Sequence, residues 1–274
     1  KNYGISYMPQ THLVEPDKPV DLSAIPTCAE MFSDDRPAAE REFRQLRDEL
    51  VELQRRLYAQ GTQRLLVVFQ AMDAGGKDST IRKVFRGVNP QGVRVYSFKK
   101  PSKEELAHDY LWRIHKAMPP SGMIHVFNRS HYEDIIVPAV HHIVDKSVWR
   151  ERFEQINEFE SYLAATGTKI LKFYLHISPE EQKKRFLDRI ERPEKNWKFS
   201  SEDLEKRKHW HDYMAAFEEI LSRCSKADAP WYVVPADQKW YRNLAIARTL
   251  VDTLETMNPQ FPLAEDDLQS IVIE

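Results

Sequence analysis

The chain has 274 residues, of which 42% are hydrophobic and only 8 are glycine. This length suffices for one large α/β domain, or for a domain that carries a small insertion. The formal net charge of −2 gives no overall attraction to nucleic acid or to an anionic membrane, so a polyanionic partner has to bind a local cluster of basic residues. Two cysteines, Cys28 and Cys224, exclude a disulfide framework and fit a reducing compartment.

No apolar stretch approaches the roughly 18 residues that cross a bilayer, and no charged-then-apolar leader is visible. We therefore expect neither a membrane-spanning helix nor a signal peptide, and a cytoplasmic location. No internal repeat or low-complexity segment interrupts the chain. This favours a single folded domain.

Residues 1–37 contain five prolines and no sustained periodicity, which predicts an extended N-terminal arm on the surface. From Ala38 onward, leucines and a phenylalanine recur at spacings of three and four, which predicts a helix. Pro37 suits the first turn of that helix and Gly61 suits its end. We expect residues 38–274 to form one α/β domain.

Five short apolar runs, each separated from the next by a helix-length segment, predict the strands of a parallel sheet. They span residues 65–69, 93–98, 123–127, 170–177 and 231–234. Capping-box patterns at Ser102 and Ser178 predict helices that begin near Lys103 and Pro179. A last helix is expected over residues 239–257.

Residues 64–80, RLLVVFQAMDAGGKDST, place an apolar run directly before a glycine-bearing loop. The run 65–69 predicts a buried parallel strand, and the residues after Lys77 have the periodicity of a helix. Backbone N–H groups at a helix N-terminus have no intrahelical partners, and Gly75 and Gly76 let the chain fold closely around an anion. Lys77 adds a positive charge. The segment therefore predicts a P-loop that binds phosphate.

The match to the pattern G-x-x-x-x-G-K-[ST] is incomplete, because Ala71 replaces its first glycine and Asp78 its hydroxyl residue. Ser79 follows one position late. The alternative is an ordinary β-to-α turn that contains glycine. Asp73 argues against this alternative, because a carboxylate among phosphate-binding groups makes electrostatic sense when a divalent cation lies between them.

The third predicted strand runs into a polar cluster at residues 127–134, FNRSHYED. Ligand crevices of open α/β sheets lie at such strand ends. Arg129 suits a phosphate, because its planar guanidinium pairs with two oxygens and keeps its proton. P-loop enzymes commonly place a magnesium-binding carboxylate where this chain has Asn128, which leaves Glu133 and Asp134 as candidates. A solvated loop with a surface Arg–Glu pair is the simpler alternative.

Basic residues are frequent in residues 180–208, where aspartate and glutamate are interleaved with them. Arg185, Arg189 and Arg192 have spacings of four and three and are predicted to share one helix face. Such runs are commonly solvated faces. The alternative is a mobile lid over a phosphate site, with Trp197 stacked on a base or packed within the lid.

The second predicted strand ends at Lys99 and Lys100, and either lysine can face the same crevice. Taken alone, each is more commonly a solubilising surface residue. The His141-His142 pair lacks a recognisable metal-ligand spacing, so we interpret it as structural.

Five blocks resemble the family 2 polyphosphate kinases, in order along residues 40–255. They are AMDAGGKDSTIRKVFRGVNPQGVRVYSFKKPS, HDYLWR, FNRSHYED, RPEKNWKFS and APWYVVPADQKWYRN. The chain is most similar to the subgroup that acts on both nucleoside mono- and diphosphates (class III), because Asn128 replaces the aspartate of other subgroups. The resemblance implies a P-loop kinase fold: an α/β fold with a central parallel sheet of about five strands flanked by helices. It also implies a helical lid at about residues 179–200.

The resemblance further implies reversible transfer of a phosphoryl group from inorganic polyphosphate to AMP and ADP, with Mg²⁺ as cofactor and Mn²⁺ as a substitute. ATP is then a product, guanine nucleotides are further expected substrates, and neither nucleic acid nor a membrane is a partner. A homodimer or homotetramer is expected. The implied catalytic residues are Asp73, Lys77 and Arg129. Phosphate and polyphosphate are expected to bind at Ala74, Gly75, Gly76, Lys77, Asp78, Ser79, Arg185 and Arg189. The nucleotide is expected to bind at Lys99, Asn128, Arg129, Glu133 and Trp197, and the metal at Asp73 with Glu133 or Asp134.

Elementary chemistry agrees with this interpretation, because a nucleotide's terminal phosphate has its last pKa at about 6 and needs no strong general base. Positioning of the two substrates and neutralisation of their phosphate charge are sufficient for the transfer. One rival is an ATP-dependent nucleoside monophosphate kinase, which differs in its donor. Another is a non-catalytic nucleotide-binding regulatory module, for which Asn128 would be the trace of a lost carboxylate. The joint presence of Asp73, Lys77 and Arg129 argues against the second rival.

Overall fold

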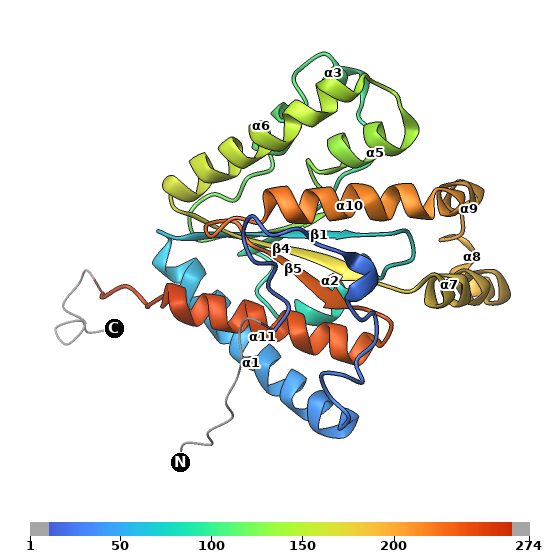
Figure 1. Cartoon of the computed structure of the whole chain (residues 1–274). Helices are drawn as coiled ribbons and strands as arrows, with labels where there is room; N and C mark the ends of the chain where they lie inside the picture. Colours follow the sequence, from blue (N-terminus) through green and yellow to red (C-terminus); the bar gives the residue numbers. More distant parts are fainter. Residues whose placement is uncertain (1–10, 265–274) are drawn as a thin grey trace.

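The computed structural model describes residues 11–264 and is built around a parallel sheet of five strands (Figure 1). The strand order is β2-β3-β1-β4-β5. The strands are β1 (Arg64–Ala71), β2 (Val93–Ser97), β3 (Ile124–Asn128), β4 (Thr168–His176) and β5 (Trp231–Pro235). All five predicted strands are confirmed, with ends within two residues of the prediction. The three inner strands β3, β1 and β4 are buried along nearly their whole length because helices cover both faces of the sheet.

Helices form a layer on each side of this sheet. The helices of the described residues are η1 (Leu22–Ala24), α1 (Arg36–Gln60), α2 (Lys77–Val84), α3 (Lys103–Leu106), α4 (Trp112–His115), α5 (Glu133–His141), α6 (Lys146–Ala165), α7 (Pro179–Glu191), α8 (Pro193–Asn196), α9 (Ser201–Lys208), α10 (Trp210–Cys224) and α11 (Lys239–Met257). Helices α1, α2 and α11 cover one face, and α5, α6 and α10 cover the other (Figure 1). Each face has its own apolar core, and the α/β fold with a central parallel sheet is confirmed.

The helix ends follow local sequence signals. Helix α1 begins at Arg36, two residues before the predicted start, because the Asp35 side chain accepts a hydrogen bond from the Ala38 N–H. It ends at Gly61, which has the left-handed φ of 67°. Ser102 forms the predicted capping box, and α11 has the predicted bounds.

The described part of the N-terminal arm packs along β5. Leu13 forms an antiparallel bridge with Tyr232, and the Val14 N–H donates to the Trp231 carbonyl at 2.9 Å. Val14 and Leu22 are buried, so the arm covers this edge of the sheet and contributes to the core. Residues 1–10 of the predicted arm lie outside the described residues.

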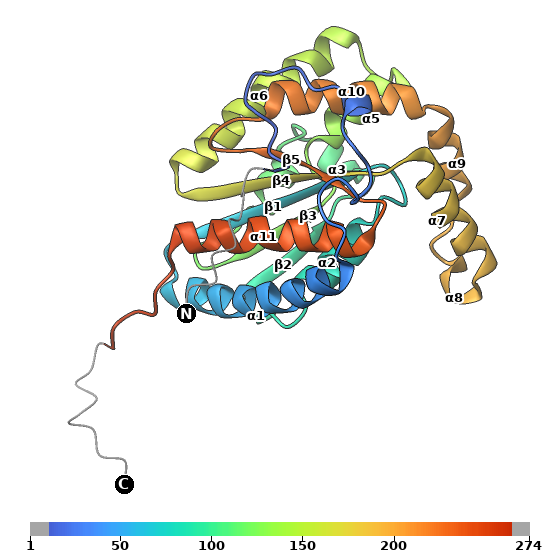
Figure 2. The same cartoon turned by 60° about the horizontal axis from the view of Figure 1, so that its bottom comes forward.

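Helices α7, α8 and α9 project from the end of the sheet where the strands finish (Figure 2). We call residues 179–208 the lid segment. It begins directly after β4 and returns to the body at α10, which packs against α5 and α6. Within residues 11–264, no helix has the length and apolar character needed to cross a membrane.

Candidate functional site

The P-loop lies between β1 and α2 and depends on its glycines. Gly76 has a φ of 102°, and a Cβ added there would lie 2.1 Å from Nη1 of Arg242. At Gly75, an added Cβ would lie 2.8 Å from the Met72 carbonyl oxygen. Both positions therefore need glycine, one for its conformation and both for the close approach of neighbouring atoms. Helix α2 then begins at Lys77, as expected for an anion-binding loop.

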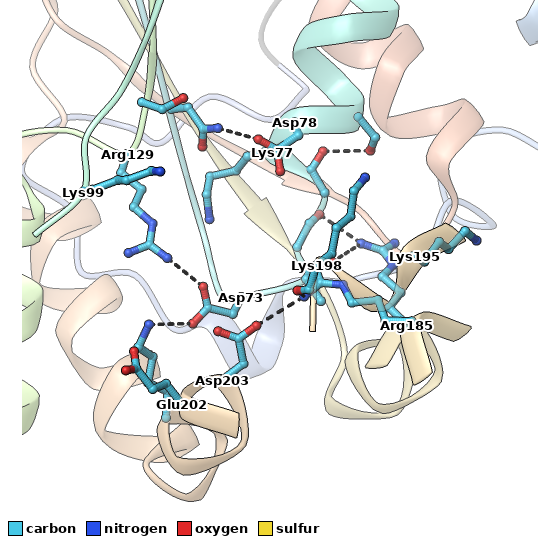
Figure 3. A pocket seen from close by; sticks show the side chains of 18 of the residues that line it. Asp73, Lys77, Asp78, Lys99, Arg129, Arg185, Lys195, Lys198, Glu202 and Asp203 are labelled. Carbon is cyan, nitrogen blue, oxygen red and sulfur yellow. Dashed lines mark hydrogen bonds and ion pairs between the residues drawn. The ribbon is translucent and has the colours of Figure 1, made fainter. Parts of the chain in front are cut away.

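A cavity of about 670 Å³ opens over this loop at the carboxyl ends of the strands (Figure 3). The register pairs Asn128 with Phe69 on β1 and with Ser97 on β2, so the ends of these three strands meet at the cavity. Five acidic residues line it, and they are outnumbered by cations. The cations are Lys77, Arg82, Lys99, Lys100, Arg129, Arg185, Arg189, Lys195, Lys198, Lys206 and Lys239. A cavity with this excess of positive charge favours a polyanionic ligand.

Asp73 lies between two cations that come from different parts of the chain. Its Oδ1 accepts from Arg129 Nη2 at 2.8 Å, and its Oδ2 lies 3.2 Å from Lys206 Nζ (Figure 3). Burial raises the pKa of Asp73, but Lys77, Arg129 and Lys206 outweigh it and hold the pKa below its ordinary value. The carboxylate is therefore ionised at neutral pH.

Lys77 is only 9% exposed, and its ammonium donates to the Ala71 carbonyl at 2.9 Å. Burial and the neighbouring Arg129 lower the pKa of Lys77 to about 8, although Asp73 and Glu133 act in the opposite direction. A bound phosphate would restore the charge, because it adds negative charge beside a desolvated amine.

Arg129 follows β3 with a left-handed φ of 65°. Its N–H donates to the Phe69 carbonyl at 3.1 Å, which fixes the bend against β1. The guanidinium reaches Asp73 and also lies 3.6 Å from Glu133. It thus enters the cavity across from Lys77, with two acidic partners that hold its direction.

The sequence matches one kinase family over most of its length. A family model described as Polyphosphate kinase 2 matches residues 33–262. The chain belongs to the polyphosphate kinase 2 family. It is 48% identical over 262 residues to the AMP/ADP-polyphosphate phosphotransferase of Meiothermus ruber, with 95% of this chain and 98% of that protein covered. It is 45% identical over 255 residues to the ADP-polyphosphate phosphotransferase of Rhodopseudomonas palustris, covering 89% of this chain and 88% of that protein.

A solved structure supports the same conclusion. The polyphosphate kinase 2 of Arthrobacter aurescens TC1 superposes with a TM-score of 0.89 at 37% identity, and 95% of this chain and 97% of that chain are covered. The predicted kinase fold, the family and a phosphotransferase activity are therefore confirmed.

Within this family member, Asn128 and Asp78 form a direct link. Asn128 Nδ2 donates to Asp78 Oδ1 at 2.7 Å, and both residues line the cavity. The hydroxyls of Ser79 and Thr80 both donate to the Gly76 carbonyl at 2.9 Å. These hydroxyls stabilise the start of α2, while Asp78 occupies the position of the usual P-loop hydroxyl.

The three arginines predicted to share a helix face differ in their contacts. Arg185 is buried, and its guanidinium donates to the carbonyls of Ala74 at 3.0 Å and Gly75 at 2.9 Å. Arg189 lines the cavity and lies 3.2 Å from an oxygen of Asp203. The prediction of one shared helix face is wrong for Arg192, because α7 ends before it.

Three predicted site residues do not line this cavity. Trp197 is 78% exposed, and its indole N–H donates to the Glu194 carbonyl at 3.1 Å. Asp134 pairs with Arg113 at 3.6 Å, and burial raises the pKa of its carboxyl group. Glu133, in contrast, shares a small space of about 40 Å³ with Asp73.

Sequence reasoning missed five basic residues of the cavity and three acidic ones, Asp188, Glu202 and Asp203. Lys206 reaches Asp73 from α9, and Arg82, Lys195, Lys198 and Lys239 also line the cavity. Lys195, Lys198 and Lys206 belong to the basic run already noted, but sequence periodicity alone did not show which face of the lid segment meets the P-loop. Arg82 lies on α2 one turn after Ser79, so both side chains share a face of the helix. This spacing could have predicted that Arg82 lines the cavity.

A divalent cation fits this donor set. No group of three or more His, Cys, Asp or Glu residues suited to a metal occurs within residues 11–264. Mg²⁺ is commonly held by one or two carboxylates together with substrate phosphates and water, and does not need such a cluster. Asp73, ionised and beside Glu133, supplies a donor set of this kind.

Proposed function

We propose that this kinase transfers the terminal phosphoryl group of inorganic polyphosphate to AMP and ADP, giving ADP and ATP, and that it catalyses the reverse reaction. The observation that carries the proposal is the cation-rich cavity over the P-loop. The cations of this cavity extend from the P-loop onto the lid segment. They cover a longer distance than a single nucleotide phosphate would occupy. The relative from Meiothermus ruber, named for polyphosphate and for both acceptors, supports the same choice.

The chemistry follows from charge and position. The acceptor phosphate carries its negative charge at neutral pH, because its last pKa is about 6, and no proton has to be removed before it attacks. Lys77 and Arg129 flank the position of the transferring group and neutralise the charge on its oxygens. One phosphoanhydride bond forms as another breaks, so the direction follows the substrate concentrations.

We assign the two ends of the cavity to different substrates. Lys99 and Asn128, at the ends of β2 and β3, would bind the phosphates of the nucleotide. Arg189, Lys195 and Lys198 on the lid segment would bind successive phosphates of the polyphosphate chain. The terminal phosphate of the nucleotide and the terminal phosphate of the polyphosphate chain would then meet at Lys77, aligned for transfer.

Mg²⁺, with Mn²⁺ as a substitute, would be held by Asp73 and the substrate phosphates, with Glu133 as the second candidate carboxylate. When bound, such a cation neutralises phosphate charge and aligns the two substrates. Lys206 and Arg129 hold Asp73 in place by ion pairs.

The deciding experiment incubates AMP and, separately, ADP with long-chain polyphosphate and Mg²⁺ in the absence of ATP, and follows the products by chromatography. Formation of ADP and then ATP is the expected result. Turnover of AMP only when ATP is supplied would identify an ATP-dependent monophosphate kinase. No turnover with either donor would leave a nucleotide-binding regulatory module.

The same assay with GMP and GDP tests guanine nucleotides as further acceptors. We also propose a homodimer or homotetramer in the cytoplasm. Light scattering of the purified protein tests the assembly, because a monomer would show the mass of 32.3 kDa.

A further inference from the structure

A fully buried charged network lies beneath the loop that carries Arg129. Lys172 on β4 and Glu160 on α6 form an ion pair, with exposed fractions of 0% and 1%. His131 Nε2 and the Tyr132 hydroxyl each lie 3.0 Å from Glu160 Oε1, and both residues are fully buried. Because an ionised carboxylate only accepts hydrogen bonds, both groups donate to Glu160.

Lys172 is fully bonded within this network. Its ammonium contacts Glu160 and donates to the Tyr132 hydroxyl at 2.9 Å and to the Cys224 carbonyl at 2.7 Å. It also lies 5.3 Å from the ring centroids of Tyr132 and Trp231. All three of its donors have partners, which makes the network rigid. None of these residues lines the cavity, so they act on the reaction only through other groups.

The network is joined to Arg129 by a very short stretch of backbone. His131 and Tyr132 are the second and third residues after it, and the Tyr132 N–H donates to the Ser130 hydroxyl at 3.2 Å. Arg129 itself has a φ of 65°, a conformation that costs energy for a residue with a Cβ. A bend of this kind persists when its surroundings fix both ends, and the network fixes the end that leads into α5.

Stability alone is a poor explanation for these residues. A buried ion pair loses much of its attraction to desolvation, and apolar residues of similar volume commonly stabilise a fold as well or better. The neighbourhood is apolar, since Phe153, Ile156 and Ile170 belong to the same buried core. The buried charges coincide instead with two consecutive side chains of the loop that carries Arg129.

We infer that Glu160 and Lys172 are positioning residues: through His131 and Tyr132 they hold residues 129–132 so that Arg129 reaches Asp73 and the transferring phosphoryl group. The kinetic consequence rests on the proposed function. Displacement of Arg129 weakens contacts that are strongest in the transition state, so kcat should fall more than KM rises.

The test compares two double variants that both lack the buried charges. In Glu160→Gln with Lys172→Met, the amide oxygen still accepts from His131 and Tyr132. In Glu160→Leu with Lys172→Met, these two donors lose their acceptor. At a temperature where circular dichroism shows both proteins folded, we expect the first to keep kcat within about threefold of the parent and the second to lose about tenfold or more. Equal kcat values for the two would overturn the inference.

Hydrogen–deuterium exchange provides a readout that does not need turnover. Amides of residues 129–134 should exchange faster in the leucine variant than in the glutamine variant, and unchanged exchange would contradict the positioning role. If the parent fails to turn over ADP with polyphosphate, the proposed function fails, while the exchange comparison still decides the role of the network.

Tyr132→Phe decides the question if the leucine variant does not fold. It removes one hydroxyl and leaves Lys172 and Glu160 paired. The matched control is Tyr174→Phe, a tyrosine only 1% exposed on the same strand as Lys172, whose hydroxyl contacts the sulfur of Met214 at 3.6 Å. We expect a several-fold loss of kcat for Tyr132→Phe alone. A parent-like kcat for Tyr132→Phe would exclude the inference.

Discussion

The cavity has two walls, which hold their cations in different ways. One is formed by residues 73–79, which we call the P-loop wall, and the other by the lid segment. On the P-loop wall, Lys77 is nearly buried and bonded to a backbone carbonyl, so its position is set by the fold. On the lid segment, Arg189, Lys195 and Lys206 are 20% to 31% exposed and each pairs with a carboxylate. Lys77 is thus ready for one phosphoryl position, whereas Arg189 and Lys195 have to leave a carboxylate before they bind a phosphate. The P-loop wall should therefore control kcat, and the lid segment should control substrate affinity.

Replacing Lys77 with alanine should produce the largest effect. We expect kcat to fall about 10²-fold, the loss typical of removing a group that stabilises transition-state charge. Asp73→Asn should lose a similar factor. The control is Lys83→Ala, an exposed lysine on the same helix that does not line the cavity. Activity of Lys77→Ala within about threefold of the parent would show that the P-loop wall does not carry the chemistry.

The pH dependence tests whether Lys77 acts in its charged form. Its pKa of about 8 means that the free enzyme loses this charge above that pH. Phosphate binding favours the charged amine, so kcat/KM should decline about tenfold per pH unit above this value. The substrates do not cause the decline, because their phosphates are fully ionised by then. A profile of kcat/KM that stays flat to about pH 10 would contradict the assignment.

Local sequence patterns predicted the P-loop wall well. The apolar run before Gly75 and Gly76 belongs to one continuous segment, so strand, loop and helix follow from neighbouring residues. The contact of Asp73 with Lys206 joins residues far apart in the chain, and it depends on how α9 docks. No spacing in the sequence reports that orientation.

The contacts of Arg185 show the same limit. The start of its helix was predicted correctly, but the sequence did not show that the guanidinium donates to carbonyls of the P-loop. Similarly, the pairing of Lys172 with Glu160 arises where α6 packs on β4, which periodicity alone does not show. Contacts within one element were predictable, whereas contacts between distant elements were not.

Lys206 and Lys208 provide a matched pair on the lid segment. Both belong to α9, but Lys206 reaches Asp73, whereas Lys208 is 68% exposed and pairs with Glu205 on its own helix. We expect Lys206→Ala to lower kcat/KM for polyphosphate by about five- to tenfold, because a charge-assisted contact is lost. Lys208→Ala should change it by less than about twofold. Equal effects would mean that only the total charge of the lid segment matters.

Trp197 should produce the smallest effect, and it separates two views of the lid segment. The indole is largely exposed and does not line the cavity over the P-loop. If the lid segment keeps this position during turnover, Trp197→Ala should leave KM for ADP within about twofold of the parent. If the lid segment closes and stacks the indole on the base, KM should rise more than about fivefold, because base–aromatic stacking contributes roughly 1–3 kcal/mol. We expect the first result, because the indole N–H is bonded to the Glu194 carbonyl of α8, the short helix that ends directly before Trp197. KM for ADP, measured at saturating polyphosphate, therefore reports whether the lid segment reaches the nucleotide or serves the polyphosphate chain alone.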